Sequence, residues 1–120
     1  MAKQEDSGHS FLAYFKRATS PLAVFRILSD RPMYGYELIQ ELKQRSGGKY
    51  QLSLLYPVLY RLEEQGYLTI SASEIVDGRA RNYYAVTPAG RDYLRQTLAE
   101  YAEISVVFQQ LMEDWDGYEA

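Results

Sequence analysis

Leucine-rich stripes at helical spacing predict two short helices in the middle of the chain. The first covers about residues 35–45 and is ended by the adjacent Gly47 and Gly48. The second covers about 51–65, and Gly66 stands just past it, where a left-handed residue commonly closes a helix. The inward-facing positions are Leu38, Ile39 and Leu42 in the first helix and Leu55, Leu59 and Leu62 in the second.

The residues before these helices fit two interpretations. Ser20 followed by Pro21 has the form of an N-cap with proline at the first helical position, which predicts a helix that ends at Ser29. One longer helix from Ser10, kinked at Pro21, fits the same segment. The polar leader 1–10 is expected to be disordered.

The pattern then changes from helical to strand-like. Apolar and polar residues alternate over 68–72, Asp77 and Gly78 signal a tight turn, and residues 80–86 are typical of the returning strand. A β-hairpin is therefore predicted after the third helix.

Thr87 followed by Pro88 predicts the start of a long last helix that ends near residue 112. Its residues at alternating spacings of four and three form a heptad stripe with one polar member, and a second apolar edge accompanies the stripe. Two apolar edges exceed what one small core can cover, so we expect this helix to pair with a second copy. The predicted interface on it is Leu94, Leu98, Tyr101, Ile104, Ser105, Phe108, Leu111 and Met112.

Three helices followed by a hairpin indicate a mainly α fold of the α+β type, a winged helix-turn-helix with a long C-terminal dimerisation helix. The expected divisions are a leader 1–10, a DNA-binding domain 11–87, the dimerisation helix 88–112 and an acidic tail 113–120. In this plan the third helix lies in the major groove and the hairpin, or wing, reaches the neighbouring backbone.

The composition excludes most other kinds of functional site. The 120 residues include no Cys and a single histidine, His9, which excludes disulfides, thiolate metal sites and a multi-His metal site. We find no Gly-rich phosphate loop and no Ser-His-Asp set, so neither an enzyme nor a cofactor is expected. No apolar run reaches the ~20 residues that span a bilayer, and no signal peptide is evident, so no membrane partner and a cytoplasmic location are expected.

The formal net charge of −3 divides unequally along the chain. Residues 1–95 contain all 13 basic residues against 10 acidic ones, whereas 96–120 contain six acidic residues and no basic one. This asymmetry favours a nucleic-acid-facing body and a tail that faces elsewhere.

Three motifs in order resemble the PadR-like transcriptional regulators, in the branch with a single dimerisation helix. They are 32–38 (PMYGYEL), 55–66 (LYPVLYRLEEQG) and 77–90 (DGRARNYYAVTPAG). The resemblance implies a homodimeric repressor whose relatives bind flat or aromatic compounds at the dimer interface. Leu54 stands where the family commonly has Thr, and Asn82 where its wing often has Lys.

The predicted DNA contacts lie on the third helix, its approach and the wing. Arg79 and Arg81 point to one side of a strand and suit phosphate, although surface charge often only solubilises a turn. Tyr56 is expected near DNA and Tyr60 partly buried; both in the core is the alternative. Ser53 is either a phosphate contact or only a cap. The full set is Lys49, Ser53, Leu54, Tyr56, Pro57, Tyr60, Arg61, Arg79, Arg81 and Asn82.

An aromatic cluster precedes the first helical stripe. Phe11, Tyr14 and Phe15 either cover the protomer's own core or pack on the partner's last helix. The predicted effector contacts are Phe11, Tyr14, Tyr101 and Phe108, with coiled-coil packing as the alternative for the last two.

The function expected is a sequence-specific DNA-binding repressor that reads an inverted-repeat operator on double-stranded DNA as a homodimer. A small planar or aromatic effector at the dimer interface would release it. The alternative is a winged-helix module for protein–protein contact without direct DNA binding.

Overall fold

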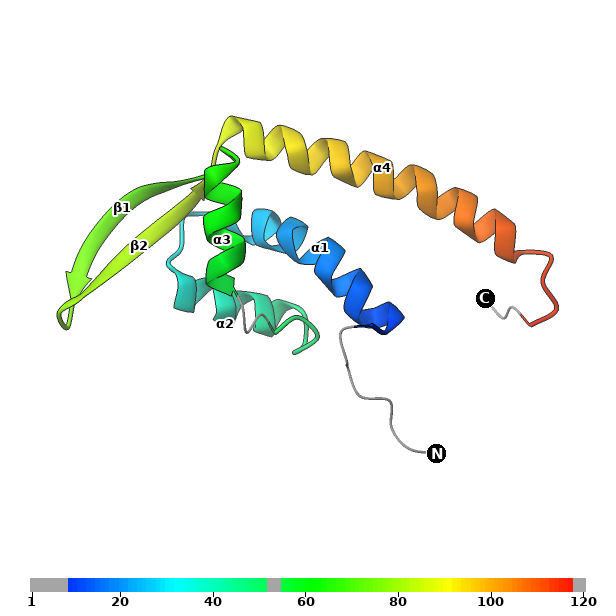
Figure 1. Cartoon of the computed structure of the whole chain (residues 1–120), viewed down its shortest axis with the longest axis horizontal. Coiled ribbons are helices and arrows are strands. Elements are labelled where there is room, and N and C mark those ends of the chain that lie inside the picture. The colour runs from blue at the N-terminus through cyan, green and yellow to red at the C-terminus, as the bar shows by residue number, and fades with distance from the viewer. Residues whose placement is uncertain (1–8, 52–54, 118–120) are drawn as a thin grey trace, which may run out of the picture.

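The computed structural model describes residues 9–51 and 55–117 (Figure 1). Its elements follow the order helix, helix, helix, hairpin, helix. They are α1 (Phe11–Leu28), α2 (Gly35–Arg45), α3 (Leu55–Glu64), β1 (Leu68–Val76), β2 (Arg79–Val86) and α4 (Pro88–Met112). The three short helices gather at one end of the hairpin, and α4 runs away from it, so the chain extends 59 × 37 × 22 Å.

The first helix is continuous, and the prediction that it starts at Ser20 is wrong. Ser10 is the N-cap, where its hydroxyl accepts from the amide of Ala13 at 3.1 Å. Ser20 is buried, and its hydroxyl donates to the Lys16 carbonyl at 2.5 Å, so it is engaged inside the helix. The longer-helix alternative is the one observed, with Pro21 inside it.

The core lies where the three helices meet the base of the hairpin, and the predicted leucine stripes of α2 and α3 enter it. Leu62 is followed by a tight end to α3, since Gly66 has φ 84° and the Tyr67 amide donates to the Leu62 carbonyl at 3.0 Å. The fully buried members are Val24, Phe25, Met33, Leu38, Leu55, Leu59 and Leu68.

The hairpin is longer than predicted, because β1 continues to Val76. The Asp77-Gly78 turn is confirmed: both residues have positive φ, 52° and 75°, and Val76 pairs with Arg79 across it. A bulge between Ile70 and Ala72 interrupts the antiparallel register. Most of β1 is exposed, so the wing projects beyond the core.

Only the first turns of α4 are fixed to the core. Thr87 caps the helix through its hydroxyl, which accepts from the Gly90 amide at 3.0 Å, as predicted. Tyr67 and Tyr93 stack with ring centroids 4.6 Å apart, and both rings meet Phe25 edge-on. Gly90 is the only buried residue of α4, so the helix has little of its own protomer to pack against.

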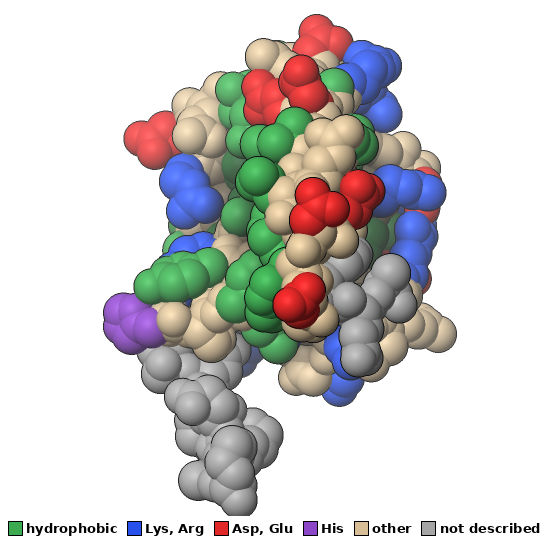
Figure 2. All heavy atoms as spheres, turned by 90° about the vertical axis from the view of Figure 1, so that its right-hand side faces the viewer, with side chains coloured by type: hydrophobic (Ala, Val, Ile, Leu, Met, Phe, Trp, Pro, Cys, Tyr) green, Lys and Arg blue, Asp and Glu red, His purple; other side chains and the backbone are tan. Residues whose placement is uncertain are grey.

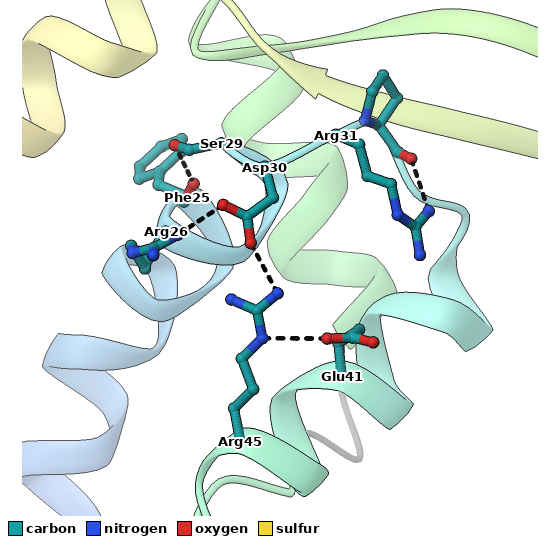
Figure 3. A network of polar contacts seen from close by, with 8 residues as sticks. Phe25, Arg26, Ser29, Asp30, Arg31, Glu41 and Arg45 are labelled. Carbon is teal, nitrogen blue, oxygen red and sulfur yellow. Dashed lines mark hydrogen bonds and ion pairs between the residues drawn. The ribbon is translucent and has the colours of Figure 1, made fainter.

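A polar network joins the ends of α1 and α2 (Figure 3). Asp30 accepts from Arg45 at 2.7 Å and from Arg26 at 2.9 Å, and Arg45 also donates to Glu41 at 3.0 Å. These hydrogen bonds from Arg45 and Arg26 lower the pKa of Asp30. The network is exposed to solvent, so its contribution to stability is small.

Candidate nucleic-acid interface

A groove of about 660 Å³ lies between the helices and the wing. Its hairpin wall includes Arg79, Arg81 and Asn82, and its helical wall contains four tyrosines and one glycine. We call it the wing groove; its helical wall is Tyr34, Gly35, Tyr36, Tyr56 and Tyr60. Aromatic rings beside arginines give it stacking surfaces and anion-binding groups together.

The outer face of α3 carries the tyrosines into the groove. Tyr56 and Tyr60 are separated by one helical turn, with ring centroids 6.3 Å apart. Their exposed fractions are 46 % and 58 %, so the expectation that Tyr60 is partly buried is wrong, and neither ring fills the core. Leu55 and Leu59 occupy the inner face instead.

The two wing arginines have different surroundings. The Arg81 guanidinium lies 4.1 Å from the centre of the Tyr34 ring and 3.7 Å from a Glu74 oxygen. Arg79, next to the turn, is exposed, and its guanidinium has no hydrogen bond or ion pair with any residue of 9–51 or 55–117. Asn82 accepts a hydrogen bond from Ser73 at 2.7 Å across the hairpin.

Tyr84 forms the floor of the groove. It is 2 % exposed, and burial raises the pKa of its phenol, with smaller contributions from Tyr60 and Glu63. The phenol is therefore neutral at physiological pH and contributes packing rather than negative charge. Its backbone pairs with Met33, which attaches the wing to the segment before α2.

The other predicted DNA contacts are distributed around this groove. Pro57 and Arg61 are exposed on α3 but do not line it, and exposed Lys49 lies in the turn before α3. Ser53 and Leu54 lie outside the described residues. The groove also contains Tyr34, Gly35 and Tyr36, which were not predicted as contacts although they are the centre of the first motif.

A second surface consists of exposed apolar side chains on α1 and α4. Hydrophobic side chains form a band on this face, with acidic side chains beside it (Figure 2). Leu94 packs against the protomer's own core, and Ser105 and Met112 are partly buried. The exposed members of the predicted interface are Phe11, Tyr14, Phe15, Leu98, Tyr101, Ile104, Phe108 and Leu111.

The α1 part of this surface does not cover the protomer's own core. Phe11 is 80 % exposed, and its ring lies 6.0 Å from that of Phe15. Tyr14 contacts His9 through its hydroxyl at 3.3 Å and lies under the Arg17 guanidinium. Of the two interpretations, the one in which these rings merely close the core is wrong for Phe11 and Tyr14.

Within the described ranges, no three His, Cys, Asp or Glu side chains gather as a metal-binding cluster. Nor does any described helix have the length and hydropathy to cross a membrane.

The model of the "Transcriptional regulator PadR-like family" matches residues 24–96, which span the core helices, the wing and the start of α4. The chain belongs to the PadR-like family. It is 43 % identical over 91 residues to "Transcriptional regulator Rv3488" of Mycobacterium tuberculosis, a match covering 73 % of this chain and 83 % of that protein. PadR-like proteins are non-enzymatic regulators of transcription, so the chain is a transcriptional regulator and not an enzyme.

Solved structures agree with the winged helix-turn-helix assignment. A PadR family regulator from Eggerthella lenta superposes with a TM-score of 0.75 at 28 % identity, covering 84 % of this chain and 88 % of that one. A transcriptional regulator from Clostridium thermocellum gives 0.74 at 24 % identity, covering 83 % and 99 %. The predicted mainly α winged fold is confirmed.

Proposed function

We propose that this PadR-like protein is a sequence-specific DNA-binding repressor that acts as a two-fold dimer. The wing groove carries the proposal, because exposed tyrosines of α3 face wing arginines across it in a transcriptional regulator. Exposed aromatic and cationic groups on a recognition helix and its wing suit DNA better than they suit a protein core.

In the proposed complex α3 enters the major groove and the wing follows the adjacent backbone. Tyr56, Tyr60 and Arg61 would meet base edges or phosphates from the exposed face of α3. Arg79 would neutralise a phosphate, which makes binding weaken as salt rises. Lys49, Ser53, Leu54, Pro57, Arg81 and Asn82 complete the proposed contact set.

A second copy of the chain would cover the apolar face of α1 and α4. The support is the extent of this face and the weak attachment of α4 to its own protomer. Obligate interfaces are larger and more apolar than transient ones, which fits a face of this composition. The dimer would present two α3 helices to successive major grooves about 34 Å apart, and thus read an inverted repeat.

The effector would bind at that same interface. Phe11 and Tyr14 on α1, and Tyr101 and Phe108 on α4, are all at least half exposed in one protomer. Their rings offer stacking to a planar aromatic compound, and the tyrosine hydroxyls offer hydrogen bonds. Such a compound would lower DNA affinity only as far as it prefers a dimer with wrongly spaced wings. Tyr101→Ala should weaken DNA release by a planar phenol; unchanged release would place the effector elsewhere.

The DNA claim is tested by titrating the protein into a duplex of its own upstream DNA at two salt concentrations. We expect tight binding that weakens with salt, and at least a tenfold loss in the variant Arg79→Ala plus Arg81→Ala. The matched control is Arg91→Ala plus Arg95→Ala, which removes two exposed charges outside the groove. Absence of binding, or equal binding by both variants, would contradict the proposal and favour a protein–protein module.

A further inference from the structure

Tyr34 and Gly35 stand where α2, α3 and the wing meet. Just before them, the Met33 backbone exchanges hydrogen bonds of 2.9 and 3.2 Å with Tyr84 of β2. Gly35 is itself the first residue of α2, and Tyr34 is its N-cap. Both residues line the wing groove, so one short segment contacts each element that the proposed complex uses.

Gly35 makes room for the recognition helix. A Cβ at this position would lie 2.5 Å from Cζ and 2.8 Å from Cε1 of Tyr56, and closer still to its hydroxyl oxygen. Gly35 is not among the glycines with positive φ, so its backbone would accept another residue. The glycine is therefore required by the tyrosine ring that rests on it.

The Tyr56 ring is not locked in a core. It is 46 % exposed, so a Cβ at residue 35 can displace the ring toward solvent without opening the hydrophobic interior. An alanine there also favours a helix over glycine. Gly35→Ala should therefore redirect the Tyr56 side chain within the groove and leave the fold intact.

Tyr34, on the helical wall of the groove, contacts two side chains of the hairpin. Its ring lies under the Arg81 guanidinium at 4.1 Å and meets the Tyr83 ring edge-on at 5.4 Å between centroids. Glu74 accepts from the Tyr83 hydroxyl at 3.3 Å and pairs with Arg81 at 3.7 Å. Arg81 is thereby attached to the start of α2, whereas Arg79 remains exposed nearer the turn.

We propose that Tyr34 and Gly35 are positioning residues that set the distance between α3 and the wing. Gly35 seats the Tyr56 ring, and Tyr34 holds the wing through Arg81. This inference rests on the proposed function, since it assigns the two walls of the DNA-binding groove to a single dipeptide. It also assigns different roles to the two wing arginines: Arg81 orients the wing, and Arg79 contacts phosphate.

The test of the first wall is a double-mutant cycle read by affinity for the upstream duplex and by thermal unfolding. Gly35→Ala should weaken binding about tenfold while the unfolding temperature stays equal or rises. Gly35→Ala should cause the same loss of affinity in a Tyr56→Phe background, where the ring is kept. In a Tyr56→Ala background, where the ring is absent, Gly35→Ala should change affinity less than twofold.

The test of the second wall compares Tyr34→Phe, which keeps an aromatic face, with Tyr34→Leu. Tyr34→Leu should weaken binding about fivefold relative to Tyr34→Phe, while the dependence of affinity on salt is the same in both variants because Arg79 is unchanged. Amide relaxation by NMR should show faster motion at 77–81 in Tyr34→Leu alone.

Three results would overturn the inference. They are equal effects of Gly35→Ala in all three Tyr56 backgrounds, unfolding of Gly35→Ala, and a wing whose motion is the same in both Tyr34 variants. If the unsubstituted protein binds no upstream duplex, the proposed function fails by itself. The NMR comparison then still decides whether Tyr34 holds the wing.

Discussion

The wing groove and the α1/α4 face both expose large apolar side chains, but different charges surround them. The groove places tyrosines beside Arg79 and Arg81. The α1/α4 face ends in a region with six carboxylates and no basic residue after Arg95. A polyanion fits the first surface, and an apolar surface such as the same face of a second copy fits the second. The net charge of −3 combines an excess of three positive charges over residues 1–95 with six negative charges over 96–120, and it describes neither surface.

The largest expected effect comes from placing the same charge on each surface. Phe108→Asp should abolish the dimer, because a carboxylate buried in an apolar interface costs several kcal/mol. Light scattering should then give the chain mass of 13.9 kDa instead of about twice that value.

The matched change in the groove is Tyr60→Asp. It should leave the dimer intact and abolish DNA binding through repulsion from phosphate. If Tyr60→Asp also loses the dimer, or Phe108→Asp keeps it, the two surfaces do not have separate roles.

A second prediction separates the two faces of α3. Leu59→Ala should lower the free energy of unfolding by about 2–5 kcal/mol, because its side chain is fully buried. Tyr60→Ala, one position along and exposed, should change it by less than about 0.5 kcal/mol and yet weaken DNA binding. Urea unfolding of both variants measures the difference; similar losses of stability would mean that Tyr60 belongs to the core.

A third, smaller effect concerns one charge. Arg79→Ala should weaken binding about three- to tenfold and reduce the salt slope by about one, as expected for one lost phosphate contact. Arg95→Ala on α4 lowers the net charge by the same amount outside the groove and should leave the slope unchanged. An unaltered slope in Arg79→Ala would remove this arginine from the phosphate contacts.

The smallest effect is a pH dependence of stability. Arg45 and Arg26 hold the pKa of Asp30 below its ordinary value near 3.8. A carboxyl with a lowered folded pKa stabilises the fold above its unfolded pKa, and this contribution is lost as pH falls through the folded value. Asp30→Asn should therefore be slightly less stable than the unsubstituted chain at pH 7, and this difference should disappear at an acidic pH below the lowered folded pKa of Asp30.

Urea midpoints at the two pH values measure this difference. Asp114→Asn, in the acidic region after α4, is the control for the change in net charge. A stability difference between Asp30→Asn and the unsubstituted chain that persists unchanged at low pH would assign the loss to packing instead.

The sequence predicted the elements well where one signal was unambiguous. The leucine stripes, the Asp77-Gly78 turn and the Thr87-Pro88 start of α4 are all local, and each has a direct physical cause. The Ser20-Pro21 pair led to a wrong start for α1. The same pair that often begins a helix also fits inside one when the Ser20 hydroxyl donates to the Lys16 carbonyl one turn earlier.

The site could be predicted only in part, because its two walls are distant in sequence. Strand spacing placed Arg79 and Arg81 together, but nothing local shows that Tyr34 lies under Arg81 or that Tyr56 rests on Gly35. Those contacts depend on how α2, α3 and the wing pack. The glycine between two tyrosines was the available signal, since glycine at a helix start can mark the close approach of another group.

The central claim is that two copies of this chain bind one duplex in a sequence-dependent way. The most direct measurement is the mass of the complex, by light scattering, with a duplex of its own upstream DNA and with a scrambled duplex of equal length. We expect two chains per upstream duplex at a salt concentration where the scrambled duplex stays free. One chain per duplex, or equal complexes with both duplexes, would contradict it.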